Sequence, residues 1–458
     1  MQKLSVKITL RLTKVLNVAA MLLPLMLCWH GWYAQRVYGP DPGLVSWLVA
    51  AVFAFLYITY GRVYESFSVS RVRISEMIYS QCLSLLMADV LLYFIFCMMA
   101  HGIAPPVPMI LIFCIQLLLA VCWSTAVHVW YFKAFPPKRT AIVYDRHRNI
   151  EPLISAYGLE KKYQIRKIVT VDECIGDRMI QLADMETVFL CGIHSHERNI
   201  ILKHCVKEHI TAYVLPRIGD VIMSGAKRVH LFHLPFLRVE RYDPTPEYLL
   251  LKRLFDIVVS AAALVLLSPV LLVTAIAIRA YDGGPAFYRQ TRLTRNGKKF
   301  GVLKFRSMRV DAEKDGVARL STGDNDDRIT PIGRFIRKVR IDELPQLINI
   351  LEGSMSIVGP RPERPEIARQ YEAQLPEFSL RLQAKAGLTG YAQVYGKYNT
   401  TPYDKLQMDL MYIAHPSLLE DLRIIFATVK ILFIPESTEG VSEGMETAME
   451  KEEESVSI

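Results

Sequence analysis

The feature that most constrains the fold is a series of four long apolar runs within the first 135 residues. Each run is close to the roughly 20 residues that an α-helix needs to cross the hydrocarbon core of a bilayer. A spanning backbone must satisfy its hydrogen bonds internally, which helices do. We therefore expect a membrane α-helical bundle of four transmembrane helices over residues 1–135, at Val15–Tyr33, Val45–Tyr60, Cys82–Ala100 and Pro108–Phe132.

Basic residues flank these runs unevenly. They precede the first run, separate the second from the third and follow the fourth, at Lys3, Lys7, Arg11, Lys14, Arg62, Arg71, Arg73, Lys133, Lys138 and Arg139. The other two connections hold only Arg36 and no lysine. Because basic loops stay in the cytoplasm, we expect a multi-pass protein whose chain after residue 135 is cytoplasmic. No small-residue cleavage site follows the first run, so we expect no cleavable signal.

One acidic residue, Asp89, lies inside the third run. An intramembrane acid is a functional candidate by default. A helix-end carboxylate or a structural pair is the favoured interpretation here.

The charge distribution indicates what the chain binds. The net charge is +9, but the segment 436–458 holds eight Glu and one Lys, so the rest of the chain carries +16. In a chain with membrane segments, this excess of basic residues indicates binding to lipid headgroups and phosphorylated ligands rather than to nucleic acid. The acidic tail, which is short of aromatic residues, is expected to be disordered. The eight cysteines form no CxxC pair, and a reduced, cytosolic setting is expected.

Residues 139–240 alternate short β-branched or apolar runs with helical stretches, which predicts a parallel α/β sheet of Rossmann-like type. The first run leads into Asp145-Arg146-His147-Arg148, without the glycine of a dinucleotide phosphate turn. A regulatory or assembly domain is therefore favoured over cofactor binding. The expected strands are Thr140–Tyr144, Arg166–Val171, Thr187–Cys191 and Ala212–Leu215. A metal site is disfavoured because the spacing of the candidate ligands fits no standard zinc pattern; these are Cys191, His194, His196 and His204.

A fifth apolar run, Ile257–Ile278, opens a mixed α/β domain expected at 248–434. Lysines and arginines lie on both sides of it, so both flanks are predicted to be cytoplasmic. Ser268-Pro269 lies at its centre, where proline removes a backbone donor and bends a helix. We expect a re-entrant membrane helix over residues 254–279 that breaks at this point. A kinked spanning helix is the alternative.

Cations and carboxylates suited to phosphate chemistry follow. Lys304 and Arg306 are two apart on a predicted strand, so their side chains share one face. Pro331–Ile341 is a basic amphipathic helix expected to lie in the membrane surface. Asp342-Glu343 then opens a second helix. Carboxylates there are often only caps, but next to a phosphate-binding cation pair they can attack phosphorus and hold Mg²⁺.

A proline-rich loop and two further helices complete this domain. Gly353–Pro365 carries Arg361 and Arg364, and a rigidly held guanidinium suits bidentate phosphate binding. Asp409 lies in a helical stretch and is a further acidic candidate. An amphipathic segment, Leu422–Ile434, is expected to pack at the membrane face.

Residues 251–434 resemble the bacterial sugar transferase family, the large monotopic phosphoglycosyl transferases. The resemblance is carried by the Ser268-Pro269 break, KFRSM from Lys304, DELPQLINILEGSMSIVGPRP from Asp342, AGLTGYAQV from Ala386 and DLMYI from Asp409. The chain departs from the family pattern at two positions. Thr294 stands where glycine is common, and Ala386 stands where proline is common.

The resemblance implies a role for each matched residue. Asp342 would be the nucleophile that attacks the sugar-bearing phosphate and releases UMP, after which polyprenyl phosphate completes a ping-pong transfer. Glu343 would assist as a base or supporting partner, and Mg²⁺ would bridge Asp342 and the diphosphate. The implied substrate-binding residues are Lys304, Arg306, Pro360, Arg361, Pro362 and Asp409.

The four apolar runs and the α/β middle resemble long-form members of this family, which prime capsule, exopolysaccharide or O-antigen synthesis at the bacterial inner (cytoplasmic) membrane. The implied substrates are a UDP-hexose, with glucose expected and galactose as the alternative, and undecaprenyl phosphate. Downstream glycosyltransferases and a homodimer are implied as partners. A glycosyltransferase and a non-catalytic scaffold are the competing classes, and their products separate them: UDP for the first, and no nucleotide for the second.

Overall fold

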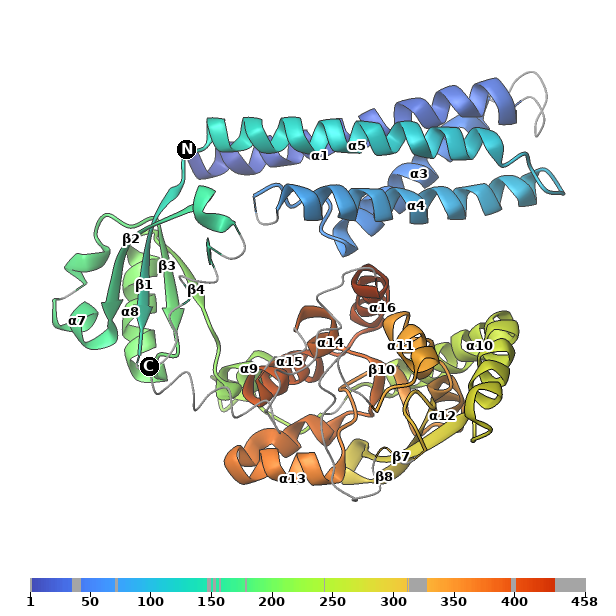
Figure 1. The fold of residues 1–458 in the computed structure, drawn as a ribbon. Helices are drawn as coiled ribbons and strands as arrows, with labels where there is room; N and C mark the ends of the chain where they lie inside the picture. The colour runs from blue at the N-terminus through green and yellow to red at the C-terminus, as the bar shows by residue number, and fades with distance from the viewer. Residues whose placement is uncertain are drawn as a thin grey trace. The chain divides into compact units, whose positions relative to one another are not determined.

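The computed structural model describes residues 2–34, 43–70, 73–145, 150, 154–155, 158–177, 179–242, 244–310, 312, 328–396 and 401–432 (Figure 1). The chain divides into two compact units, Met1–Leu215 and Pro216–Ile458. The tail expected at 436–458 lies outside the described residues.

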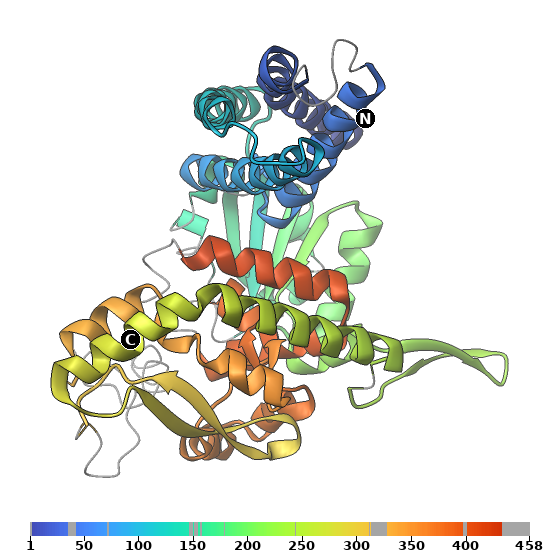
Figure 2. The ribbon, with the colours of Figure 1, turned by 90° about the vertical axis from the view of Figure 1, so that its right-hand side faces the viewer.

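The first unit begins with long apolar helices. They are α1 (Gln2–Cys28, continued by the π-helical turn Trp29–Tyr33), α3 (Gly43–Val63), α4 (Ile74–Met99) and α5 (Val107–Ala134). Each covers one of the predicted runs to within one residue and is long and apolar enough to cross a membrane. α1 and α4 both pack against α3 and α5, and Figure 2 shows this bundle nearly end-on. Outward-facing residues such as Leu23 and Phe55 are apolar and exposed, as expected of a surface that meets lipid.

The interior of this bundle holds polar side chains. Tyr57 donates a hydrogen bond to Asn17 (2.8 Å), and Trp29 donates one to Ser46 (2.8 Å). Asp89 lies near the middle of α4 and is only 3% exposed. Among the described residues its carboxylate oxygens have no hydrogen-bond partner. The interpretation of Asp89 as a helix-end carboxylate or structural pair is therefore wrong.

The first unit ends in a four-stranded parallel sheet with strand order β2-β1-β3-β4. The strands are β1 (Lys138–Tyr144), β2 (Tyr163–Thr170), β3 (Thr187–Cys191) and β4 (Thr211–Val214), within a few residues of the predicted ranges. Short helices, α7 (Val171–Gly176) and α8 (Ser195–Lys207), connect them. The predicted parallel α/β sheet is confirmed.

The second unit begins earlier than the predicted catalytic domain. Helix α9 (Ile218–Ser224) and the antiparallel strands β5 (Lys227–Leu231) and β6 (Leu234–Arg238) belong to it. Val221 of α9 is buried in the main core of this unit.

Helix α10 (Pro246–Asp282) spans 37 residues and stays helical through Ser268 and Pro269. The Thr245 side chain accepts a hydrogen bond from the Tyr248 N–H at its start, and Gly283 ends it with a φ of 71° that favours glycine. Figure 2 shows the helix bending along its length, as an internal proline predicts. Its middle is apolar and exposed, with Val265 at 74% and Leu266 at 77%.

Both ends of α10 are fixed to the same unit. Near the start, Arg253 donates to the carbonyls of Ile350 and Leu351 (2.6 and 2.7 Å), and Lys252 forms an ion pair with Asp421 (2.8 Å). Near the end, Ile278 packs with Phe305 and Ile336, and Asp282 forms an ion pair with Arg306.

The rest of the unit is a compact mixture of short strands and helices. The strands β7 (Phe287–Leu293) and β8 (Lys299–Phe305) form an antiparallel hairpin, and β9 (Ser356–Val358) pairs in parallel with β10 (Gly387–Thr389). The helices are α11 (Pro331–Lys338), α12 (Gln346–Glu352), α13 (Pro365–Gln374), α14 (Tyr391–Tyr395), α15 (Pro402–Ala414) and α16 (Leu418–Leu432).

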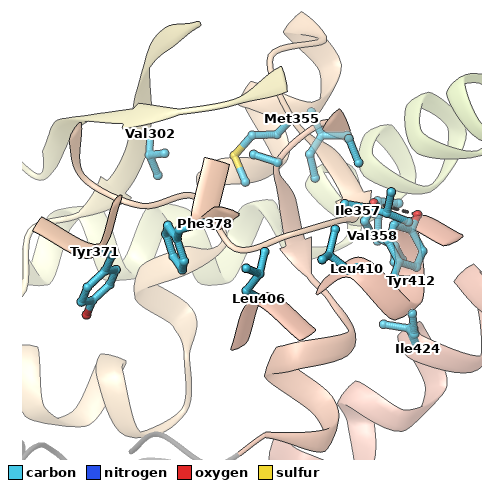
Figure 3. Packing of buried hydrophobic residues seen from close by; sticks show 14 of the residues in the cluster. Val302, Met355, Ile357, Val358, Tyr371, Phe378, Leu406, Leu410, Tyr412 and Ile424 are labelled. Atoms are coloured by element: carbon cyan, nitrogen blue, oxygen red, sulfur yellow. Dashed lines mark hydrogen bonds between the residues drawn. The ribbon is translucent and has the colours of Figure 1, made fainter. Parts of the chain in front are cut away.

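The core of this unit joins these elements (Figure 3). Val302 of β8, Met355 and Ile357 near β9, and Leu406 and Leu410 of α15 are all buried in it. The basic helix α11 presents Ile336 to a smaller core, while Phe335 stays 62% exposed. One side of α11 is thus available to a membrane surface.

Asn349 ties α12 to β8. Its side-chain oxygen accepts the Leu303 N–H (2.8 Å), and its nitrogen donates to the Gly301 carbonyl (3.0 Å). These two bonds fix β8 immediately before Lys304. Because only Leu344 and Pro345 separate Asp342-Glu343 from α12, Asn349 sets how the strand and the acid pair face each other.

We predict that Asn349→Ala lowers the free energy of unfolding by about 1–3 kcal/mol, because a backbone N–H and a carbonyl lose their partners. Chemical unfolding of the detergent-solubilised full chain measures the change. The control is Gln374→Ala, at an exposed position of α13. Equal stability of the two variants would contradict this role for Asn349.

Candidate active site

The predicted acid pair lies in a single 3-10 turn, Ile341–Glu343, between α11 and α12. Arg340, which precedes this turn, has a φ of 54°, in the left-handed region that is uncommon for residues other than glycine. This residue redirects the chain from α11 into the turn. The pair therefore stands one turn ahead of α12, which begins at Gln346, rather than opening that helix as predicted.

Cations from separate parts of the chain converge on Glu343. Lys304 Nζ of β8 and Arg361 Nη2 of the proline-rich loop each lie 2.8 Å from Glu343 Oε1. Arg340 Nη1 lies 3.9 Å from Oε2. Burial alone would raise the pKa of Glu343, but Arg361, Lys304 and Arg340 together hold it well below its usual range. Glu343 is thus a carboxylate held in its charged form.

The neighbouring carboxyl has the opposite shift. Burial, and then the negative charge of Glu343, raise the pKa of Asp342 to about 6, against the opposing effect of Lys304 and Arg337. Burial also lowers the pKa of Lys304, with Glu343 opposing. Two adjacent carboxyl groups with pKa values pushed apart by their surroundings are the usual sign of different chemical roles.

Hydrogen bonds to backbone carbonyls fix the proline-rich loop on both sides of Arg361. The Pro360 carbonyl accepts the Gly387 N–H (3.0 Å), and the Pro362 carbonyl accepts Arg292 Nη1 (3.3 Å). A side chain at Gly387 would place its Cβ 2.1 Å from the Gly359 nitrogen, so the loop and the GLTG turn approach closely only because both residues are glycines. The loop is therefore rigid where Arg361 leaves it.

Asp409 lies in a buried ion pair behind this loop. It is 1% exposed, and Arg381 Nε and Nη2 lie 2.8 and 2.6 Å from its Oδ2. Arg381 Nη2 also donates to the Arg361 carbonyl (2.9 Å). Asp409 thus acts on Arg361 through Arg381.

Sequence reasoning missed a second carboxylate that organises the same loop. Glu363 Oε1 lies 3.0 Å from Lys405 Nζ and 3.7 Å from Arg381 Nη1, and Glu363 Oε2 lies 3.9 Å from Arg292 Nη1. Burial would raise the pKa of Glu363, but these cations lower it to about 2. The only signal in the sequence is its position between the prolines of PRPERP; Arg381 and Lys405 lie in unremarkable helical segments.

Arg306 is not brought to the acid pair by any described contact. It is 8% exposed, and its guanidinium contacts Asp282 at the end of α10 and packs against Gly284. β8 ends at Phe305, so Arg306 lies just beyond the strand that carries Lys304, and the predicted shared strand face is wrong. Lys304 binds Glu343, whereas Arg306 binds the end of the long helix. Ser268 and Pro269 lie at the exposed middle of that helix, where Ser268 donates to the Val265 carbonyl (2.8 Å).

The two departures from the family pattern contact each other. Thr294 Oγ1 accepts the Ala386 N–H (3.1 Å) and donates to the Ser354 carbonyl (3.0 Å). Glycine at 294 would lack this hydroxyl, and proline at 386 would lack this N–H. The substitutions therefore form one matched pair that ties the β7–β8 hairpin to the strand pair β9–β10.

Comparison with known proteins agrees with this geometry. Residues 247–435 match a family model described as bacterial sugar transferase. Over 254 residues the chain is 35% identical to an Aeromonas hydrophila protein named UDP-N-acetylgalactosamine-undecaprenyl-phosphate N-acetylgalactosaminephosphotransferase, covering 55% of this chain and 58% of that one. Over 212 residues it is 42% identical to the UDP-glucose:undecaprenyl-phosphate glucose-1-phosphate transferase of Escherichia coli K12, covering 45% and 44%.

These matches span about half the length of those two relatives. A third relative, an exopolysaccharide production protein of Rhizobium leguminosarum bv. phaseoli, is 43% identical over 190 residues, which make up 40% of this chain and 94% of that protein. The matched region contains the acid pair, the cations around Glu343 and the proline-rich loop. The chain belongs to the bacterial sugar transferase family.

Proposed function

We propose that this chain transfers a hexose 1-phosphate from a UDP-hexose to undecaprenyl phosphate and releases UMP, as the first membrane step of capsule, exopolysaccharide or O-antigen synthesis. The observation that carries the proposal is the acid pair: a carboxyl with a raised pKa next to a carboxylate held by Lys304 and Arg361. The names of the relatives support the substrate classes.

Asp342 is the nucleophile in this proposal. Glu343 is occupied by its cations, whereas Asp342 carries no such close ion pair among the described residues. An Asp342 carboxylate oxygen attacks the phosphorus that bears the sugar, and the bond from that phosphorus to the UMP oxygen breaks. A phosphate oxygen of undecaprenyl phosphate then attacks the same phosphorus, and the bond to Asp342 breaks. The carboxylate is regenerated, so the two substrates need not occupy the site together.

Lys304 and Arg361 bind the diphosphate of the donor. Both are already held by Glu343 at 2.8 Å, so they are positioned before the substrate arrives and lose little freedom on binding. Pro360 and Pro362 fix the loop that presents Arg361, and Asp409 supports it through Arg381. Arg306 supports the site from the end of α10.

Mg²⁺ fits this site. Magnesium is usually held by one or two protein carboxylates together with substrate phosphates. The negative charge of Asp342 is buried beside that of Glu343, so a bound cation would stabilise it. Asp342 would hold the ion, which would neutralise charge developing on the phosphate oxygens.

The membrane arrangement follows from α10. Both of its ends are fixed to one catalytic unit while its apolar middle is exposed, which supports a re-entrant helix that enters and leaves on the cytoplasmic face. The four N-terminal helices would span the inner membrane, and the parallel sheet would be a Rossmann-like regulatory domain. A homodimer and downstream glycosyltransferases complete the proposal.

We predict that Asp342→Asn lowers lipid-dependent UMP release on the order of 10³-fold or more, because the nucleophile is lost. Purified enzyme with Mg²⁺ and undecaprenyl phosphate is assayed with UDP-glucose, UDP-galactose and UDP-N-acetylgalactosamine, and the productive donor identifies the sugar. Glu377→Gln, at an exposed carboxylate, is the control and keeps full activity. Release of UDP would instead indicate a glycosyltransferase, and undiminished UMP from Asp342→Asn would exclude this nucleophile.

We predict that at limiting Mg²⁺ the rate of the first half-reaction rises with pH through about 6, the pKa of Asp342 without a bound cation, because only the ionised carboxyl attacks. Below that pH the rate falls about tenfold per pH unit. Glu343→Gln removes the negative charge beside Asp342 and so lowers the pKa of Asp342. The rise of the rate with pH then occurs at lower pH, whatever the absolute rate of the variant. Single-turnover UMP release between pH 5 and 8 measures both. A wild-type profile that is flat across this range would contradict the assignment.

A further inference from the structure

A second group of cations lines a cavity that the proposed reaction does not use. The cavity measures about 230 Å³ and lies where the start of α10 meets β9 and the segment before β10. Its charged lining residues are Lys252, Arg253, Arg295, Lys385 and Asp256. Four cations and one carboxylate therefore share one small space.

Asp256 and Asp421 balance only part of this charge, which leaves an excess of two positive charges. Lys252 is paired with Asp421, and Asp256 accepts the Ile357 N–H (3.0 Å). Arg253 binds two carbonyls, and Arg295 lies over the Tyr242 ring at 6.0 Å. Within the described residues, no acidic side chain forms an ion pair with Lys385. Burial, and then the charge of Arg253, lower the pKa of Lys385, while Asp256 opposes them.

An unused hydroxyl faces the same cavity. Ser356 lines it and is 1% exposed, and its Oγ has no hydrogen-bond partner among the residues that the structure describes. A buried polar group without a partner is rare in folded proteins and points to a ligand. A hydroxyl beside several cations matches a phosphate group, whose oxygens accept hydrogen bonds from both.

The size of the cavity limits the ligand. Pockets for drug-sized molecules begin at about 300 Å³, so this one suits a phosphate or diphosphate group and not a whole nucleotide sugar. It adjoins the carboxyl end of α12, where Arg253 binds Ile350 and Leu351, whereas the acid pair precedes the amino end of that helix.

We propose that this cavity is a phosphate-binding site, in which Lys385, Arg253 and Arg295 neutralise the anion and Ser356 donates a hydrogen bond to it. The phosphate comes from a lipid headgroup or from free phosphate in the cytoplasm, since both offer the same oxygens. The site lies at the start of the membrane helix, so its occupant stabilises the contact between α10 and the strand pair β9–β10.

Isothermal titration of the full-length, delipidated protein in detergent tests the proposal, with inorganic phosphate as one probe and short-chain phosphatidic acid as the other. Lys385→Gln is expected to weaken binding at least about tenfold, the effect of one lost charge-assisted contact. Ser356→Ala is expected to weaken it several-fold without loss of folding, because its hydroxyl makes no hydrogen bond to any described residue. Lys298→Gln, at an exposed lysine, leaves binding unchanged.

The two probes and the variants distinguish the possible outcomes of this titration. If the Lys304→Gln variant still binds the probe and the Lys385→Gln variant does not, the phosphate binds in this cavity and not at the acid pair. Binding of inorganic phosphate identifies a free anion as ligand, whereas binding of phosphatidic acid alone identifies a lipid headgroup. If neither probe distinguishes Lys385→Gln and Ser356→Ala from Lys298→Gln, the proposal is overturned, whatever the activity of the enzyme.

Discussion

The candidate active site in the second unit depends on the contact of Glu343 with Lys304 and Arg361. One carboxylate oxygen receives a lysine from β8 and an arginine from the proline-rich loop, both at 2.8 Å. A buried carboxylate is stable only when such partners compensate for its lost hydration. Folding of the turn, the strand and the loop therefore has to end in one arrangement, and that arrangement places two cations beside Asp342.

A second set of ion pairs makes the loop a rigid support. Glu363 and Asp409 share Arg381, which also binds the Arg361 carbonyl. Such buried pairs contribute little net stability, but removal of one partner leaves an uncompensated charge, which costs about 3–5 kcal/mol. The network therefore restricts the loop to one conformation and fixes the backbone from which Arg361 reaches Glu343.

Sequence patterns predicted the elements better than the contacts between them. Apolar runs near membrane length located α1, α3, α4 and α5, and β-branched runs located the strands of the parallel sheet, because both signals are local. The family motifs named Asp342, Glu343, Lys304 and Arg361, which the structure brings together. The partners of Asp409 and Arg306, and the role of Glu363, arise from residues 18 or more positions away in the chain, and no local periodicity records such pairings.

The long helix and the acid pair rest on the same two elements. β8 carries Lys304, which binds Glu343, and is followed directly by Arg306, which binds Asp282 at the end of α10. α12 follows Glu343 and is held at its carboxyl end by Arg253 from the start of α10. The two ends of α10 thus contact α12 and the residue that follows β8, and both of these elements adjoin the acid pair. In the proposed re-entrant arrangement, the depth of the exposed apolar middle of α10 would set the height of Asp342 above the bilayer. The phosphate of the proposed lipid substrate would then reach Asp342 while the second unit stays at the membrane surface.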